Sequence, residues 1–180
     1  NPMNAIILYG SRYGASQTYA QALEARTGIP AVAYQEIQDF GPFDTIVYIG
    51  GLYAGKTTGL AKTVRHFPTD HPFRLLVATV GLSDLAVEDN LLRIRESLAQ
   101  ELSPGIFVRT THVHLRGAID YSVLTTRHRL MMKGLCTLLR RQPAEDRSPD
   151  TQALLDSYGK AVDFIDLDTL APIQTWLEKG

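Results

Sequence analysis

The sequence predicts an α/β domain in which five parallel strands form one doubly wound sheet with helices on both faces. Short, continuously apolar runs alternate along the chain with segments of helical periodicity, a pattern typical of strands that are covered on both sides. A helical crossover between consecutive strands forces them to pair in parallel. The 180 residues contain neither a repeat nor a linker between two cores, so we expect a single domain over residues 1–180.

Five segments are predicted as strands because they are rich in apolar or β-branched residues and are bounded by turn signals. They are residues 5–10 (AIILYG), 31–34 (AVAY), 45–50 (TIVYIG), 74–80 (RLLVATV) and 107–115 (FVRTTHVHL). The stretch DFGPFD at residues 39–44 has the composition of a turn that leads into the third strand.

Five further segments show the apolar spacing of helices and lie between or after the strands. They are residues 17–26, 58–67, 88–102, 125–141 and 170–179. The first three end at helix-stopping residues, namely Gly28, Pro68 and the pair Pro104-Gly105. The polar residues 142–149 are expected to form an exposed loop.

Composition excludes several classes of function. A net charge of −1 gives no indication of a nucleic-acid partner. Cys136 is the only cysteine, which excludes a disulfide framework, and its leucine neighbours predict a buried, inert thiol. His112 and His114 share one face of the fifth predicted strand, but no third ligand accompanies them, so we expect no metal.

We also expect a cytoplasmic protein. No signal peptide precedes the first predicted strand, and no apolar run approaches the roughly 20 residues that a membrane span needs.

Small residues follow four of the predicted strands, at the sheet edge where doubly wound folds bind ligands. These loops are residues 11–16 (SRYGAS), 50–56 (GGLYAGK), 79–84 (TVGLSD) and 115–121 (LRGAIDY). A helix that begins near Ser16 directs free N–H groups and its positive end at the first loop, which favours a phosphate. The loop lacks the lysine of a triphosphate loop and the glycines of a dinucleotide loop, so a mononucleotide is predicted. Capping of the helix by Ser16 alone is the alternative.

The stretch SRYGAS after an apolar strand resembles the flavodoxin phosphate loop, [ST]-x-x-G-x-[ST], which holds the 5′-phosphate of FMN. The resemblance implies strand order 2-1-3-4-5, FMN as the cofactor, and an isoalloxazine ring flanked by the second and third loops. Tyr13 stands where the family usually has its third-position hydroxyl residue. The cofactor-binding residues implied are Ser11, Arg12, Tyr13, Gly14, Ala15, Ser16, Gly51, Leu52, Tyr53, Ala54, Gly55, Thr79, Val80, Gly81, Leu82 and Asp84.

Within that superfamily the chain is most similar to the menaquinone-dependent protoporphyrinogen IX dehydrogenases of heme biosynthesis. The similarity lies in the length, the pattern Gly50-Gly51-x-Tyr53-x-Gly55, and residues 115–121 followed by the basic, apolar segment 125–141. It implies an oxidoreductase with a quinone acceptor and with Arg116 and Tyr121 at the substrate, the flavin itself carrying the chemistry. The run GLSDLAVEDN after Val80 does not match those enzymes.

Other interpretations remain open. One alternative is an electron carrier that serves a redox partner protein. Another is a flavodoxin-like domain that has lost FMN. A near-neutral charge gives little steering toward a basic partner, which disfavours the carrier. Residues 125–141 form either a sheet-covering helix or a contact surface for a second copy of the chain, an anionic substrate or a membrane.

Overall fold

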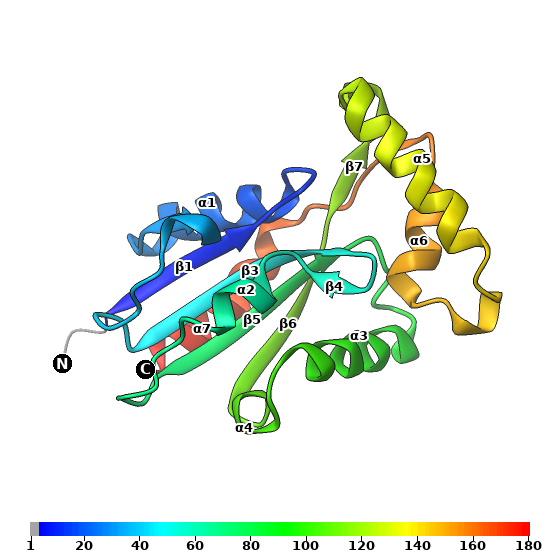
Figure 1. Ribbon diagram of the computed structural model, residues 1–180. Helices are drawn as coiled ribbons and strands as arrows, with labels where there is room; N and C mark the ends of the chain where they lie inside the picture. The colour runs from blue at the N-terminus through cyan, green and yellow to red at the C-terminus, as the bar shows by residue number, and fades with distance from the viewer. Residues whose placement is uncertain (1–3) are drawn as a thin grey trace.

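The central sheet has the strand order β2-β1-β3-β5-β6, in a computed structural model that describes residues 4–180 (Figure 1). Its parallel strands are β1 (Ala5–Gly10), β2 (Ala31–Ala33), β3 (Thr45–Tyr53), β5 (Arg74–Gly81) and β6 (Thr110–Arg116). This order confirms the doubly wound α/β prediction, because the five strands pair in the expected sequence 2-1-3-4-5. A short sixth strand, β4 (Lys56–Thr57), pairs antiparallel with the end of β3 and was not predicted.

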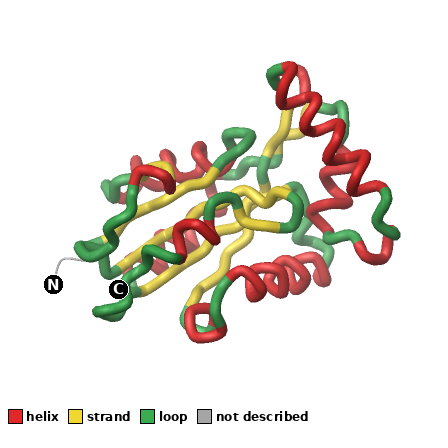
Figure 2. The backbone as a smooth tube through the Cα atoms, viewed as in Figure 1, coloured by secondary structure: helices red, strands yellow, loops and turns green. Residues whose placement is uncertain are grey.

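Helices cover both faces of the sheet (Figure 2). On one face α1 (Ala15–Thr27) and α7 (Ala171–Glu178) bury Leu23 and Ile173 against β1, β3 and β5. On the other face α2 (Leu60–Val64) and α3 (Glu88–Glu101) bury Leu60 and Leu98. No helix within residues 4–180 is long and apolar enough to cross a bilayer.

Between β6 and α7 the chain forms an additional unit, called here the insert (residues 118–163). It consists of β7 (Ala118–Asp120), α5 (Thr126–Arg140), α6 (Pro149–Ser157) and β8 (Ala161–Asp163), with β7 and β8 paired antiparallel. Its own core includes Tyr121, Met132 and the fully buried Cys136, as predicted for that thiol. The insert extends from the carboxyl ends of the strands, at the upper right of Figure 1.

Most element ends shift by one to three residues from the sequence prediction, and three larger differences concern whole segments. Strand β6 begins at Thr110 because Pro104 starts a short helix, α4 (Pro104–Phe107), which takes up Phe107. The expected loop before Pro149 holds a 3₁₀ turn, and α6 follows it. Short 3₁₀ turns span Tyr34–Glu36, Tyr121–Val123, Ala144–Asp146 and Leu167–Leu170.

The third difference concerns the loop predicted after residue 50. Strand β3 continues through Leu52 and Tyr53 and turns back into β4 as a hairpin. Both turn residues have positive φ, 51° at Ala54 and 80° at Gly55, which is the geometry of a tight two-residue hairpin turn. Thr57 fixes the hairpin to α3, because its N–H and hydroxyl both donate to the Glu101 carboxylate at 2.8 Å.

Candidate cofactor site at the carboxyl ends of the strands

The first loop, residues 11–16, connects β1 to the start of α1. Gly14 precedes the helix at φ 91°, a conformation that favours glycine, and its N–H donates to Ser11 Oγ at 2.9 Å. No side chain among the described residues 4–180 caps α1, so none of their side-chain oxygens satisfies the first N–H groups of the helix. These N–H groups and the helix dipole make the loop suited to an anion.

Ser16 gives the loop a second donor. Its side chain is only 1% exposed, and its Oγ has no hydrogen-bond partner among residues 4–180. A Cβ at Gly51 would come within 3.5 Å of this Oγ, so the hydroxyl lies between the start of α1 and the end of β3. Buried polar groups nearly always have a partner, and an unpartnered hydroxyl beside free N–H groups therefore fits a ligand oxygen.

A small cavity of about 40 Å³ opens beside the loop. That volume is little more than the roughly 30 Å³ share of one liquid water molecule. Ten of the predicted cofactor residues line it: Ser11, Arg12, Tyr13, Ala15, Ser16, Gly51, Leu52, Val80, Gly81 and Leu82. Residues that sequence reasoning had not assigned to the cofactor complete its lining: Thr58, Gly117, Ala118, Ile119, Asp150 and Leu154.

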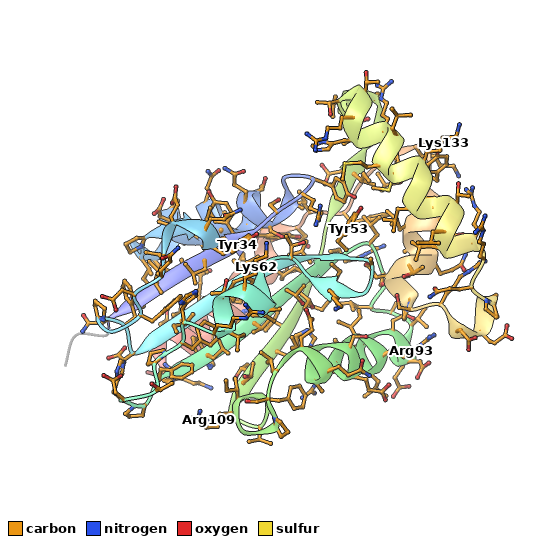
Figure 3. All side chains as sticks on the ribbon, in the orientation of Figure 1. Tyr34, Tyr53, Lys62, Arg93, Arg109 and Lys133 are labelled. Atoms are coloured by element: carbon orange, nitrogen blue, oxygen red, sulfur yellow. The ribbon has the colours of Figure 1, made fainter. Side chains whose placement is uncertain are left out.

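A second cavity of about 220 Å³ lies between the same loop and α5. Its lining residues come from the loop, the hairpin and the insert: Ser11, Arg12, Tyr13, Tyr53, His128, Met131 and Met132. The Arg12 guanidinium lies 3.9 Å from the centroid of the Tyr53 ring, on the hairpin seen in Figure 3. Tyr53 thus has one face stacked by a cation from the phosphate loop.

Tyr13 points from the loop toward the insert. Its hydroxyl contacts Met132 Sδ at 4.0 Å, and its ring packs with the core of the insert. Burial raises the pKa of the Tyr13 phenol far above its usual range, so the side chain stays neutral. The loop therefore offers its backbone and serine hydroxyls to an anion, while the Tyr13 phenol contacts α5.

Asp150 is the functional candidate that sequence reasoning missed. It sits in the first turn of α6, and its Oδ1 accepts a hydrogen bond from Leu82 N–H at 2.8 Å. A Cβ at Gly81 would lie 2.1 Å from the same oxygen, so only glycine lets the carboxyl reach the end of β5. Desolvation raises the pKa of the Asp150 carboxyl from 3.8 to about 6, although the Leu82 hydrogen bond opposes the rise.

The remaining predicted residues lie outside the small cavity. Asp84 is exposed and bonds its own turn at Ala86 N–H, 2.9 Å away. Arg116 stacks on Phe164 at 3.7 Å, and Tyr121 packs against Tyr158 inside the insert. Gly14, Tyr53, Ala54 and Gly55 belong to the loop and the hairpin turn already described.

Thr79 takes part in a buried histidine cluster instead. Its Oγ1 lies 2.8 Å from His112 Nε2 and 2.7 Å from His114 Nδ1, and a hydroxyl is able to donate to one ring nitrogen while it accepts from the other. Desolvation lowers the pKa of His112 to about 4 and that of His114 to about 3, which keeps both rings neutral at neutral pH. The described residues include no group of three or more side chains that could hold a metal ion.

A comparison with known protein families finds a match that covers both the sheet and the loop at residues 11–16. The sequence model of the flavodoxin domain matches residues 6–145, from β1 through α5 and including the phosphate loop. The chain belongs to the flavodoxin family. No curated protein matches it. Flavodoxin domains commonly bind FMN, so the site can be compared with the parts of that molecule.

The donors around the first loop match the oxygens of the FMN phosphate, although the cavity beside them is only about 40 Å³. Uncapped N–H groups and the Ser16 hydroxyl are donors that a phosphate accepts from, and Gly51 and Gly117 leave the approach free of side chains. The ring end is obstructed, because the Arg12 guanidinium covers one face of the Tyr53 ring and the Asp150 carboxyl closes the end of β5. A flavin ring beside Tyr53 requires the Arg12 guanidinium to leave that face.

Proposed function

We propose that the chain is an FMN-binding redox protein of the flavodoxin type. The observation that carries the proposal is the buried, unpartnered Ser16 hydroxyl beside the uncapped start of α1. Both features supply donors at one place, which is what a phosphate monoester needs. Family membership supports the same cofactor.

The residues take separate parts in this proposal. Backbone N–H groups at the start of α1 and the Ser16 hydroxyl would hold the phosphate, with Arg12 adding positive charge. Tyr53, fixed by the hairpin, would flank the ring. Bound FMN supplies one- or two-electron transfer, and the protein sets its orientation and electrostatic surroundings. The Asp150 side chain lines the cavity, and its ionised carboxylate would disfavour added negative charge in the site.

The test separates phosphate recognition from ring binding. FMN and riboflavin differ only by the phosphate, so quenching of flavin fluorescence on titration should be strong with FMN and at least tenfold weaker with riboflavin. The variant Ser16→Ala should weaken the binding of FMN and leave the affinity for riboflavin unchanged. Ser97→Ala removes a hydroxyl from α3 and is the matched control. A protein that quenches neither flavin would instead be a domain that has lost the cofactor.

We further propose that the bound flavin serves an enzyme rather than a carrier, with a porphyrinogen as the substrate and a quinone as the acceptor. The resemblance of residues 115–121 and 125–141 to the protoporphyrinogen dehydrogenases supports this, and the net charge of −1 disfavours long-range steering to a partner protein. Protein loaded with FMN should convert protoporphyrinogen IX to fluorescent porphyrin faster than the autoxidation blank. Reduction by a reductase without any such conversion would favour the electron carrier.

A further inference from the structure

A large groove lies beside the cofactor cavity, between the flavodoxin core and the insert. Its volume is about 550 Å³, within the range of roughly 300–1,000 Å³ typical of small-molecule sites. The loop after β5 and the start of α3 form one wall, and α6 with the end of β8 forms the other. Arg93 lies in the half of α3 that is nearer to α6 (Figure 3). Leu82 lines both this groove and the cofactor cavity, so the two sites adjoin.

The groove carries an excess of positive charge. Four cationic side chains line it, namely Arg93, Arg116, Arg147 and Lys160. Only two carboxylates, Asp84 and Asp156, oppose them. The whole chain has a net charge of −1, so an excess of two positive charges here is a local feature. A ligand with two negative charges would balance it.

Hydrogen bonds already orient these guanidinium groups. Arg116 Nη2 donates to Leu82 O at 2.9 Å while its plane stacks on Phe164, and Arg93 Nη2 donates to Arg147 O. The Nε atoms of Arg116 and Arg147 are buried and have no partner among residues 4–180. Both atoms are donors, so the missing partners are acceptors, as carboxylate oxygens are.

The rest of the lining is apolar enough to hold a hydrocarbon frame. Seven side chains contribute it: Leu82, Val87, Ala144, Pro149, Ala153, Val162 and Phe164. Arginines held over apolar and aromatic surface recognise acids with an apolar body better than they recognise small inorganic anions.

We infer that this groove binds an organic molecule that carries two acidic groups on an apolar body. On the proposed function, which this last step needs, the acid is the substrate that meets the cofactor across Leu82. The inference that the groove binds such a diacid does not depend on the proposed function, because the positive charge, the donors and the apolar lining belong to the groove itself.

Calorimetric titration of the full chain tests the inference, with and without added FMN. The probe is naphthalene-2,6-dicarboxylate, and the neutral naphthalene-2,6-dimethanol has the same ring frame. The diacid should bind at least tenfold more tightly than the diol, and salt raised from about 50 to about 500 mM should weaken it.

Variants locate the binding. Arg116→Gln should lower the affinity for the diacid about tenfold. Lys160→Gln removes an exposed charge and should lower that affinity about threefold without disturbing the fold. Arg109→Gln is the matched control, since Arg109 lies beside α4, remote from the groove in Figure 3. Thermal unfolding checks that each variant keeps its fold.

The outcomes separate the two proposals. Equal affinity for diacid and diol, or unchanged affinity in both Arg116→Gln and Lys160→Gln, would overturn the groove site. Flavin binding without diacid binding would be consistent with the proposed function and would contradict the proposed diacid site in the groove. Diacid binding that the variants weaken, in a protein that binds no flavin, keeps the groove site and removes the proposed function.

Discussion

The substitution Asp150→Asn should stabilise the protein at alkaline pH and have almost no effect in acid. Asparagine keeps an oxygen that can accept from Leu82 N–H, but it cannot become charged in the desolvated position. The raised pKa of Asp150, about 6 against an ordinary 3.8, measures how strongly the folded state disfavours the carboxylate. At about 1.36 kcal/mol per pKa unit the difference is about 3 kcal/mol.

The direction in which pH changes the stability follows from proton linkage. Below the ordinary pKa both the folded and unfolded states are protonated, and the carboxyl leaves stability unchanged. As pH rises from 3.8 through about 6 the unfolded state ionises first, so the wild-type protein loses up to about 3 kcal/mol of unfolding free energy. Asp150→Asn avoids this loss. His112 and His114 act in both proteins and cancel in the comparison.

Urea unfolding followed by circular dichroism at a series of pH values measures the effect. The variant should exceed wild type by up to about 3 kcal/mol at about pH 8, a midpoint shift of roughly 1–2 M urea, and by less than about 1 kcal/mol at pH 4. Asp156→Asn, which removes an exposed carboxylate from the same helix, is the matched control. Equal stability of Asp150→Asn and wild type at pH 8 would refute the buried contact with Leu82.

Three further predictions concern the glycines and α5. Gly134→Ala should stabilise by about 0.5–1 kcal/mol in thermal melts, because Gly134 is inside α5 and an added Cβ meets nothing within 4 Å; a lower melting temperature would contradict this. Gly81→Ala should destabilise by about 1–3 kcal/mol in urea, since its Cβ would displace the Asp150 carboxyl; unchanged stability would show that this contact is absent. Residues 121–142 carry five Arg or Lys residues and no acid, and Leu130 and Leu138 are 65% and 61% exposed on α5, so the chain should sediment with phosphatidylglycerol vesicles. Leu130→Gln with Leu138→Gln should weaken that binding about tenfold, while Val108→Gln, 79% exposed beside α4, should not; equal binding to neutral vesicles, or a dimer in light scattering without vesicle binding, would contradict the lipid surface.

The sequence was enough to predict the five core strands, because each is continuously apolar or β-branched and lies in a covered sheet. Strand β1, for example, has the predicted bounds, and residues 45–50 lie within the longer β3. The hairpin after residue 53 was missed because its turn is Ala54-Gly55, and the alanine gives no signal for positive φ. Helix α6 was missed because its polar and apolar residues are mixed and it follows a polar stretch.

The candidate site was predictable only where it is local in sequence. The loop SRYGAS contains its own glycine, serines and helix start within six residues, and the structure places them as the pattern indicates. Asp150 could not be found this way, because it reaches Leu82 across 68 residues through the fold of the insert. The groove likewise combines Arg93 of α3 with Lys160 of the insert, which no spacing connects.

Amide chemical shifts at the start of α1 test the central claim most directly. In ¹H–¹⁵N spectra of the labelled chain, added FMN should shift the N–H signals of Ala15, Ser16 and Gln17, because these groups would donate to the phosphate on the proposed function. Riboflavin should leave the same three signals in place. Unmoved signals with FMN, or equal shifts with riboflavin, would show that no phosphate binds at this helix.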